Sequence, residues 1–292
     1  MSELALPRGG PAAERAPGES VLARALSARL SVSWEAAAWA ALLVAGFGLR
    51  FWDLGSRALH HDESLHGYYA YQLYLGHGYE HTPLMHGPFQ FFGTALTFFL
   101  AGGASDYTVR ILPALFGTAL VALPLLFRSH LGRGGALAAA ALIVFSPTLL
   151  YYSRFAREDI YIAVFTLALV ICLWRYVAEE KIRYLYLAAG LLGLSFATKE
   201  NTYITTGILL VFLNLWVASD LTRQTRERLG LGRTRIALVY ALLYLPFAWA
   251  LTALWPFATR LRRRLGLEQR HPAMDLLLVV GTLAAPQFAA AI

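Results

Sequence analysis

The succession of long apolar runs is the feature that most constrains how this chain can fold. A helix needs about 20 apolar residues to cross a bilayer. The runs that we expect to be spans are 36–52, 108–127, 134–152, 160–178, 185–198, 202–218, 236–257 and 274–292. Of the 292 residues, 58% are hydrophobic and only 15% are charged, against about 25% charged residues in soluble domains. The sequence therefore predicts an all-α, polytopic integral membrane protein with about seven or eight spans.

The domain organisation follows from the same runs. Residues 1–30, rich in Pro, Gly, Ala and scattered charges, are predicted to be a disordered cytoplasmic tail. They lack the basic-then-apolar order of a signal peptide, so we expect the first run to stay as a membrane anchor. Residues 31–292 are predicted to form one transmembrane domain. Its last run reaches residue 292 without a polar flank, and we expect the chain to be the N-terminal part of a longer protein.

The basic loops orient the spans. The apolar run 88–101 is too short to be assigned with certainty as a span. If it does not fully cross and the N-terminus is cytoplasmic, the basic segments 128–135, 179–183 and 223–235 all fall on the cytoplasmic side, as the positive-inside rule requires. Residues 53–107 then form the first external loop, with interfacial helices. Whether 236–257 fully spans is left open, because the basic segment that follows it would then be external.

The net charge of +7 raises the question of nucleic-acid binding. The basic residues, however, lie in short clusters between apolar runs, where a membrane protein places its cytoplasmic loops. We therefore exclude nucleic acid as a partner and expect the bilayer itself to be the surroundings of the chain.

The first external loop opens with LHHDESLHG, residues 59–67, in which Asp62 and Glu63 stand among histidines. A tyrosine-rich stretch follows, which suits a short helix lying at the headgroup level. Asp62 could cap that helix, but capping does not explain Glu63. A carboxylate at the membrane surface is costly unless it is paired or used, so the pair is a candidate catalytic centre.

Six of the eight histidines lie between residues 60 and 86. Their spacings match no compact metal-ligand motif, because glycine and proline separate them. His61 and His86 are candidates to shape an acceptor or metal site, and a divalent cation is left open as a cofactor. A histidine-rich metal transporter is a weaker alternative, since it predicts histidines and acids within several spans.

Two further external loops carry charged residues. The segment YYSRFAREDIY, residues 151–161, offers Arg154 and Arg157 to hold phosphate oxygens and Glu158 and Asp159 to shape an acceptor or metal site. The alternative is a self-neutralising cluster at a helix end. Lys199, in the segment FATKENTY, could snorkel to the interface or meet a lipid phosphate.

The order of these motifs resembles the C-type (GT-C) membrane glycosyltransferases, of the protein-O-mannosyltransferase and aminoarabinose-transferase kind. The resemblance covers roughly residues 35–218 and is nearest to the flippase-activity-associated proteins of that superfamily. It rests on the Asp62–Glu63 pair, on HTPLMHGP at 81–88, on Arg110, on SPTLLYYSRFAREDIY at 146–161 and on ATKE at 197–200. HTPL stands where the family usually has a double proline, and the C-terminal soluble domain of some members is missing, which leaves acceptor recognition open.

The resemblance implies a polyprenyl-phosphate sugar as donor and a glycan, lipid or protein as acceptor, on the extracytoplasmic face of the cell membrane. It implies that Asp62 is the catalytic base with Glu63 as its neighbour, and that Asp159 is the second-loop acid. Lys199, with Arg154 and Arg157 as weaker candidates, would meet the donor phosphate. The alternative function is a non-catalytic, flippase-associated or transport protein for lipid-linked sugars, which needs a headgroup path but no external base.

Overall fold

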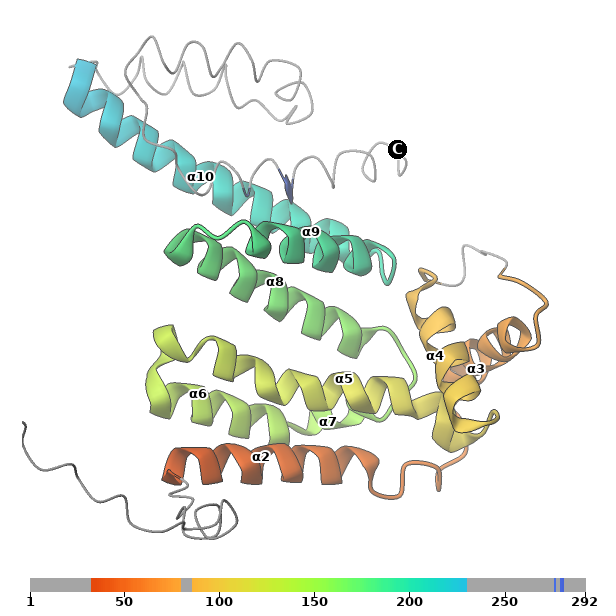
Figure 1. Ribbon diagram of the computed structural model, residues 1–292. Coiled ribbons are helices and arrows are strands. Elements are labelled where there is room, and N and C mark those ends of the chain that lie inside the picture. Colours follow the sequence, from red (N-terminus) through yellow and green to blue (C-terminus); the bar gives the residue numbers. More distant parts are fainter. Residues whose placement is uncertain (1–32, 80–85, 230–275, 277–278, 281–292) are drawn as a thin grey trace, which may run out of the picture.

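The computed structural model describes residues 33–79, 86–229 and, further on, Leu276, Val279 and Val280 (Figure 1). All regular elements in this part are helices: α2 (Trp34–Phe51), α3 (His61–Tyr74), α4 (Phe89–Ala101), α5 (Asp106–Leu126), α6 (Arg128–Phe145), α7 (Pro147–Ser153), α8 (Asp159–Glu179), α9 (Arg183–Phe196) and α10 (Asn201–Leu229). The predicted tail 1–30, His81, the span 236–257 and nearly all of 274–292 lie outside the described residues. The all-helical class is confirmed for the part that the structure describes.

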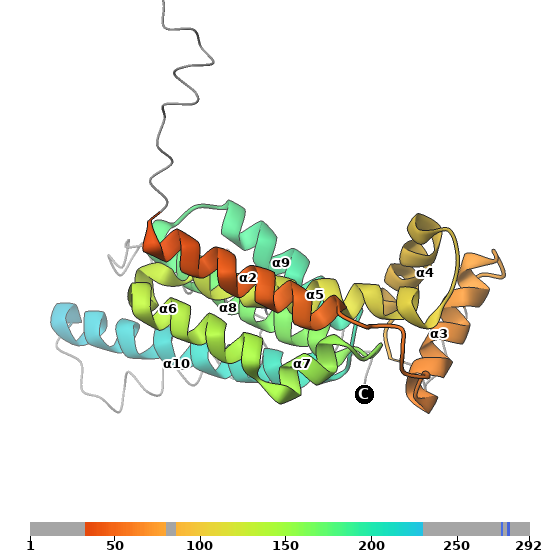
Figure 2. The ribbon, with the colours of Figure 1, turned by 90° about the horizontal axis from the view of Figure 1, so that it is seen from below.

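Helix α5 is the central element of the bundle. It packs against α2, α6 and α7 on one side and against α8 on the other, and α8 in turn packs against α9. Helices α3 and α4 pack on each other and lie beyond the ends of α2 and α5, at one end of the bundle (Figures 1 and 2). The buried apolar residues form separate clusters between these layers, so each helix buries one stripe against its neighbour.

Two helices in the described part are long and apolar enough to cross a membrane, namely α5 and α8. The pair α6 and α7 meets the same test only when taken together, and it is bent by 63°. The bend replaces the single predicted span 134–152, because Ser146 caps the second helix and Pro147 begins it, and proline cannot continue the helix before it. Residues 33–79 and 86–229 therefore contain two or three candidate spans, and the seven or eight spans of the whole chain stay a prediction.

Several other runs are helical but differ in length from the predicted spans. Helix α9 has 14 residues, or about 21 Å of rise, and α4 has 13. Both are shorter than the hydrocarbon core, which is about 30 Å thick. Helix α10 continues to Leu229, through basic residues that were expected to lie in a loop.

A buried arginine ties α2 to the bend between α6 and α7. Arg50 is 0% exposed and donates to Ser153 Oγ at 3.2 Å, to the carbonyl of Gly46 at 3.1 Å and to the carbonyl of Ile143 at 3.2 Å. The loop that bears Arg154 to Glu158 begins directly after Ser153. Arg50 therefore fixes the point from which this loop leaves the bundle.

Candidate active site

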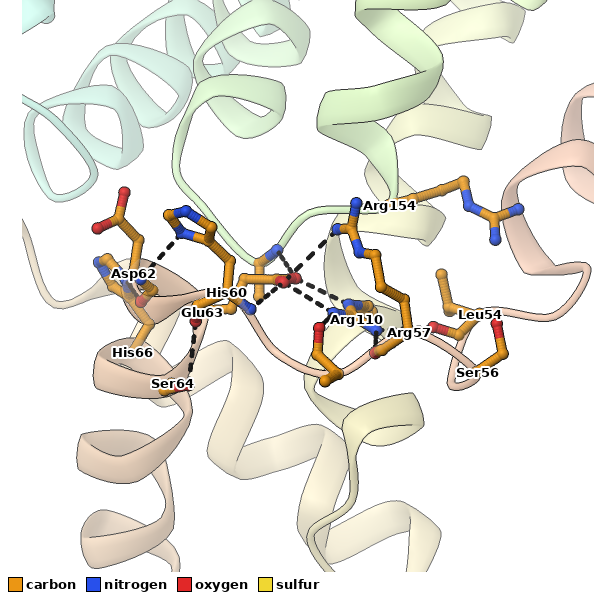
Figure 3. Close-up of polar contacts among 12 residues, drawn as sticks. Leu54, Ser56, Arg57, His60, Asp62, Glu63, Ser64, His66, Arg110 and Arg154 are labelled. Atoms are coloured by element: carbon orange, nitrogen blue, oxygen red, sulfur yellow. Dashed lines mark hydrogen bonds and ion pairs between the residues drawn. The ribbon is translucent and has the colours of Figure 1, made fainter.

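Glu63 lies at the centre of the polar contacts at the α3 end of the bundle (Figure 3). Its carboxylate is fully buried and receives both Nε and Nη2 of Arg110, each at 2.7 Å. It also accepts backbone N–H groups from His60 and Ala156, each at 3.0 Å. Burial by itself would raise the pKa of Glu63, but these donors outweigh it and the pKa lies below its usual value. Glu63 is thus ionised, both of its carboxylate oxygens accept hydrogen bonds, and it joins α3, α5 and the loop before α8.

The start of α3 shows which residues cap this helix. His60 is the N-cap, and the N–H of Asp62 donates to its Nδ1 at 3.3 Å. Glu63 completes a capping box through the N–H of His60. The prediction that Asp62 caps the helix is therefore wrong, because Asp62 is already inside the first turn and its carboxylate points to another loop.

An alternating chain of charges runs from Asp62 in α3, through Arg157 and Asp159 at the start of α8, to Lys199 between α9 and α10. Asp62 Oδ2 lies 2.9 Å from Arg157 Nη1, whose side chain also lies 3.8 Å from Asp159 Oδ2. Asp159 Oδ1 in turn lies 2.6 Å from Lys199 Nζ. Asp62 and Asp159 are each 33% exposed, Arg157 is 37% exposed and Lys199 11%. This chain, Asp62–Arg157–Asp159–Lys199, is accessible at the surface and is hereafter the ion chain.

The loop that supplies Arg157 and Asp159 is held by its apolar neighbours. Phe155 and Ala156 are buried, the carbonyl of Ala156 accepts from Gln90 Nε2 at 2.7 Å, and its N–H is bound by Glu63. Helix α7 ends at Ser153, so Arg154 and Arg157 do not share a helical face. Arg154 instead donates to the carbonyls of Leu49 and Asp53 and points away from Asp62 (Figure 3).

A second set of ionisable groups lies beside the ion chain. His66 Nε2 is 2.7 Å from Oε1 of Glu158, which is completely buried, while His66 Nδ1 meets the carbonyl of Asp62 at 2.7 Å. The other oxygen of Glu158 is 4.0 Å from His86 Nε2, and His86 Nδ1 is 2.7 Å from Glu200. These four residues, His66, Glu158, His86 and Glu200, are hereafter the histidine–glutamate set.

His66 and Glu158 shift each other's pKa. Burial lowers the pKa of His66, but the contact with the carboxylate of Glu158 outweighs this effect, and the pKa of His66 lies above its usual value. Burial raises the pKa of Glu158, and His66 more than reverses the change, so that this pKa lies below its usual value. The pair is therefore stabilised in its charged form.

A glycine allows the loops of His86 and Lys199 to touch. The N–H of Gly87 donates to the carbonyl of Thr198 at 3.0 Å, and that of Phe89 donates to the carbonyl of Ala197 at 2.9 Å. A Cβ on Gly87 would overlap the carbonyl of Ala197. Only glycine therefore permits this approach, which sets His86 against Glu200 and brings the Lys199 loop to the site.

The structure brings most of the predicted site residues together. Asp62, Arg157, Glu158, Asp159, Lys199 and His86 meet at this end of the bundle, and Glu63 lies beneath them. Arg154 does not join the ion chain. His61 is exposed, and its side chain makes no hydrogen bond or ion pair to another described residue. No group of three or more His, Cys, Asp and Glu side chains is placed to hold a metal ion in residues 33–79 and 86–229.

Three residues of the site, Arg110, His66 and Glu200, are not predicted as site residues from the sequence. In the sequence Arg110 stands only as part of a motif, yet an arginine within an apolar run signals a buried partner, which the structure shows to be Glu63. His66 stands four residues after Asp62 and three after Glu63, on one face of α3. Glu200 follows Lys199 directly, and its contact with His86, 114 positions away, has no signature in the sequence.

The fold and the site define a helical membrane protein with an ionisable site at one end of its bundle. The profile of the dolichyl-phosphate-mannose-protein mannosyltransferase family matches residues 83–249, which is more than half of the chain. The chain belongs to this family, whose members are polytopic membrane glycosyltransferases. No curated protein and no solved structure matches the chain.

Proposed function

We propose that this protein is a glycosyltransferase that transfers a sugar from a polyprenyl-phosphate donor to a hydroxyl of a glycan, lipid or protein acceptor. The family supports the class of reaction. The ion chain supports its location, because it places a partly exposed carboxylate, Asp62, within 2.9 Å of a guanidinium at the end of the bundle. A carboxylate that can take a proton and cations that can stabilise a phosphate are both present there.

In the proposed reaction, Asp62 takes the proton of the acceptor hydroxyl as its oxygen attacks the anomeric carbon of the donor. The bond between that carbon and the phosphate oxygen breaks, and polyprenyl phosphate leaves with the electron pair. Attack opposite the leaving group inverts the configuration at the anomeric carbon.

Arg157 can stabilise negative charge both on Asp62 and on the leaving phosphate. Before reaction, its guanidinium faces the Asp62 carboxylate. When Asp62 becomes protonated, it loses its charge while the leaving phosphate gains one. The guanidinium of Arg157 can then interact with the phosphate in place of Asp62. The net charge of the site is unchanged, and the developing negative charge on the phosphate is stabilised.

Lys199 is the second phosphate ligand in this proposal, paired with Asp159 at 2.6 Å until the donor binds. Glu63 has no oxygen left for a substrate, so we assign it the role of positioning α3 and hence Asp62. Arg154, bound to two carbonyls of the α2 end, is a weaker phosphate ligand than Arg157. Glu158 and His86 shape the wall next to the acceptor.

The proposal includes the side of the membrane on which the reaction occurs and the relatives that the chain resembles. We place the reaction on the extracytoplasmic face, from the positive-inside distribution of the basic loops. We place the chain near the flippase-activity-associated proteins, from the motifs of the loops.

The test is the substitution Asp62→Asn in the full chain, assayed in membranes with a labelled polyprenyl-phosphate sugar. Loss of the base should lower transfer at least about 100-fold, while the side-chain volume and the fold are kept. Asp53→Asn is the matched control: Asp53 is exposed in the same loop, its φ of 52° suits asparagine, and its carbonyl makes the contacts to Ser56 and Arg154.

Unchanged transfer by the Asp62→Asn protein would contradict the catalytic role. It would favour the alternative in which the chain helps lipid-linked sugars across the bilayer, because a headgroup path needs no base. Equal losses in both variants would point to a general effect on the loop.

A further inference from the structure

A cavity of about 480 Å³ lies at the end of the bundle opposite to the ion chain, lined by Leu125, Arg128, Ser129, Gly132, Arg133 and Arg175. Helix α8 connects the two ends, with Asp159 at its start and Arg175 near its end. At 1.5 Å per residue, about 24 Å of helix separates them, which is close to the thickness of a hydrocarbon core. The cavity, hereafter the arginine cavity, therefore opens at the other membrane surface.

The arginines of this cavity carry more positive charge than their partners balance. Arg128 makes a two-point contact with Glu35, at 2.6 and 2.8 Å. Arg133 faces the same carboxylate at only 3.5 Å, and its side chain is 70% exposed. One carboxylate thus serves two guanidiniums, and none of the cavity-lining residues is acidic.

Arg175 is held in place by its surroundings. Its Nε and Nη2 donate to the carbonyl of Leu126 at 3.1 and 2.8 Å, and its Nη1 lies 3.4 Å from Glu179. Glu179 also pairs with Lys181 and Arg183, so its charge is shared among three cations. Arg175 therefore adds a fixed positive charge to the wall of the cavity.

The backbone adds to this charge. Helix α6 is broken at Gly132, with φ 70° and ψ 173°, a conformation that favours glycine. The longer part of the helix begins after the break, with Arg133 and Gly134 in its first turn. The start of a helix presents free N–H groups and a partial positive charge, here at the wall of the cavity.

Exposed apolar side chains include one lining residue, Leu125, and three residues that directly precede or follow a lining residue in the chain. Leu125, Leu126 and Leu131 are 40%, 48% and 42% exposed, and Trp174 is 40% exposed. A site for a free anion in water needs no such border, whereas a lipid bound by its headgroup lays its acyl chains against the adjoining apolar surface.

We propose that the arginine cavity binds the phosphate group of an anionic phospholipid in the leaflet opposite to Asp62. The guanidinium of Arg133 supplies the fork that suits phosphate oxygens, and Arg175 supplies a fixed charge. Basic pockets between membrane helices at the bilayer surface are typical headgroup sites. This site takes no part in the transfer reaction and does not depend on it.

The experiment measures retained lipid on the full chain by native mass spectrometry, with phosphatidylglycerol and phosphatidylcholine compared. The intact protein should retain phosphatidylglycerol preferentially. Arg133→Gln should weaken its affinity about tenfold, from the loss of one charged hydrogen-bonding partner. Arg133→Lys keeps the charge but not the fork, and should restore part of the affinity.

Arg183→Gln is the matched control, because Arg183 is 61% exposed at the same surface and lies outside the cavity lining. An equal loss in the Arg183 and Arg133 variants would overturn the site in favour of general surface charge. Equal retention of both lipids by the intact protein, or full displacement of phosphatidylglycerol by inorganic phosphate, would overturn the lipid assignment.

Discussion

At the scale of single residues, the site depends on which charges are covered and which are accessible. Glu63 and Glu158 are both completely buried, whereas Asp62 and Asp159 are each about one-third exposed. A buried carboxylate must be paired to stay ionised, and both buried acids have a basic partner. Asp62 and Asp159 are paired with Arg157 and Lys199 at a partly exposed surface, where a substrate phosphate could compete with the carboxylates for these cations.

The charged pair of His66 and Glu158 predicts a dependence of stability on pH. The pKa of His66 is raised above 6.5 in the folded protein, so its contribution is fully present below the unfolded pKa and is lost as pH rises through the folded value. The pKa of Glu158 is lowered below 4.5, so its contribution is lost as pH falls through that value. The pair therefore stabilises the fold most between these two limits.

Thermal unfolding from about pH 6 to about pH 9 should show stability falling through the raised pKa of His66. The His66→Gln protein should lack this part of the slope, and His130→Gln, which changes an exposed histidine at the other end of the bundle, should keep it. Identical slopes in the intact and His66→Gln proteins would rule out the pair as the source.

At the scale of elements, the site depends on loops that three close approaches hold together. Segment 86–89 is bound to 197–198 by two backbone hydrogen bonds, the loop before α8 is bound to α3 through Glu63, and Arg50 fixes the end of α7. None of these contacts lies within one helix. They set the distances among Asp62, Arg157 and Lys199.

The substitution Gly87→Ala should separate the first of these pairs, because the added methyl group overlaps the Ala197 carbonyl. A displacement of about 1 Å at a site can cost about 100-fold in rate, and we expect transfer to fall by that order. Gly190→Ala, in helix α9 with nothing within 4 Å of its added methyl, should leave transfer and thermal stability intact. Full activity of the Gly87→Ala protein would show that the approach of the two loops is not needed.

The positions of several helices could be predicted from the sequence, but the contacts between them could not. The helices at 34–51, 106–126 and 159–179 follow closely from apolar runs, because hydrophobicity and helix length are local properties. The bend at Ser146 was not predicted, although Pro147 marked it. The pairing of His86 with Glu200, and the choice of Glu63 as the partner of Arg110, depend on long-range packing. The residues next to these positions in the sequence do not indicate it.

At the scale of the whole molecule, charge is divided between two ends of one bundle. The ion chain and the histidine–glutamate set lie at the α3 end, and the arginine cavity lies near the ends of α5 and α8. The positive-inside rule places the second of these on the cytoplasmic side, and this orientation stays a prediction.

Cysteine labelling tests the orientation, because the chain has a single cysteine, Cys172, which is buried. His77→Cys and Lys181→Cys place new thiols at exposed positions toward the two ends. In intact cells a membrane-impermeant maleimide should label the first variant only, and after lysis it should label both. The intact protein gives the background, and labelling of Lys181→Cys before lysis would invert the topology.

The contacts of Glu63 with later parts of the chain also affect the order in which the protein is assembled. Its partners Arg110 and Ala156 follow it by 47 and 93 positions, so both leave the ribosome after Glu63. The carboxylate must therefore stay hydrated while the next helices are synthesised and inserted, since an unpaired buried acid is unstable. The first loop can reach its final form only when residue 156 has been placed, and assembly of the site is thus one of the later events in biogenesis of the described bundle.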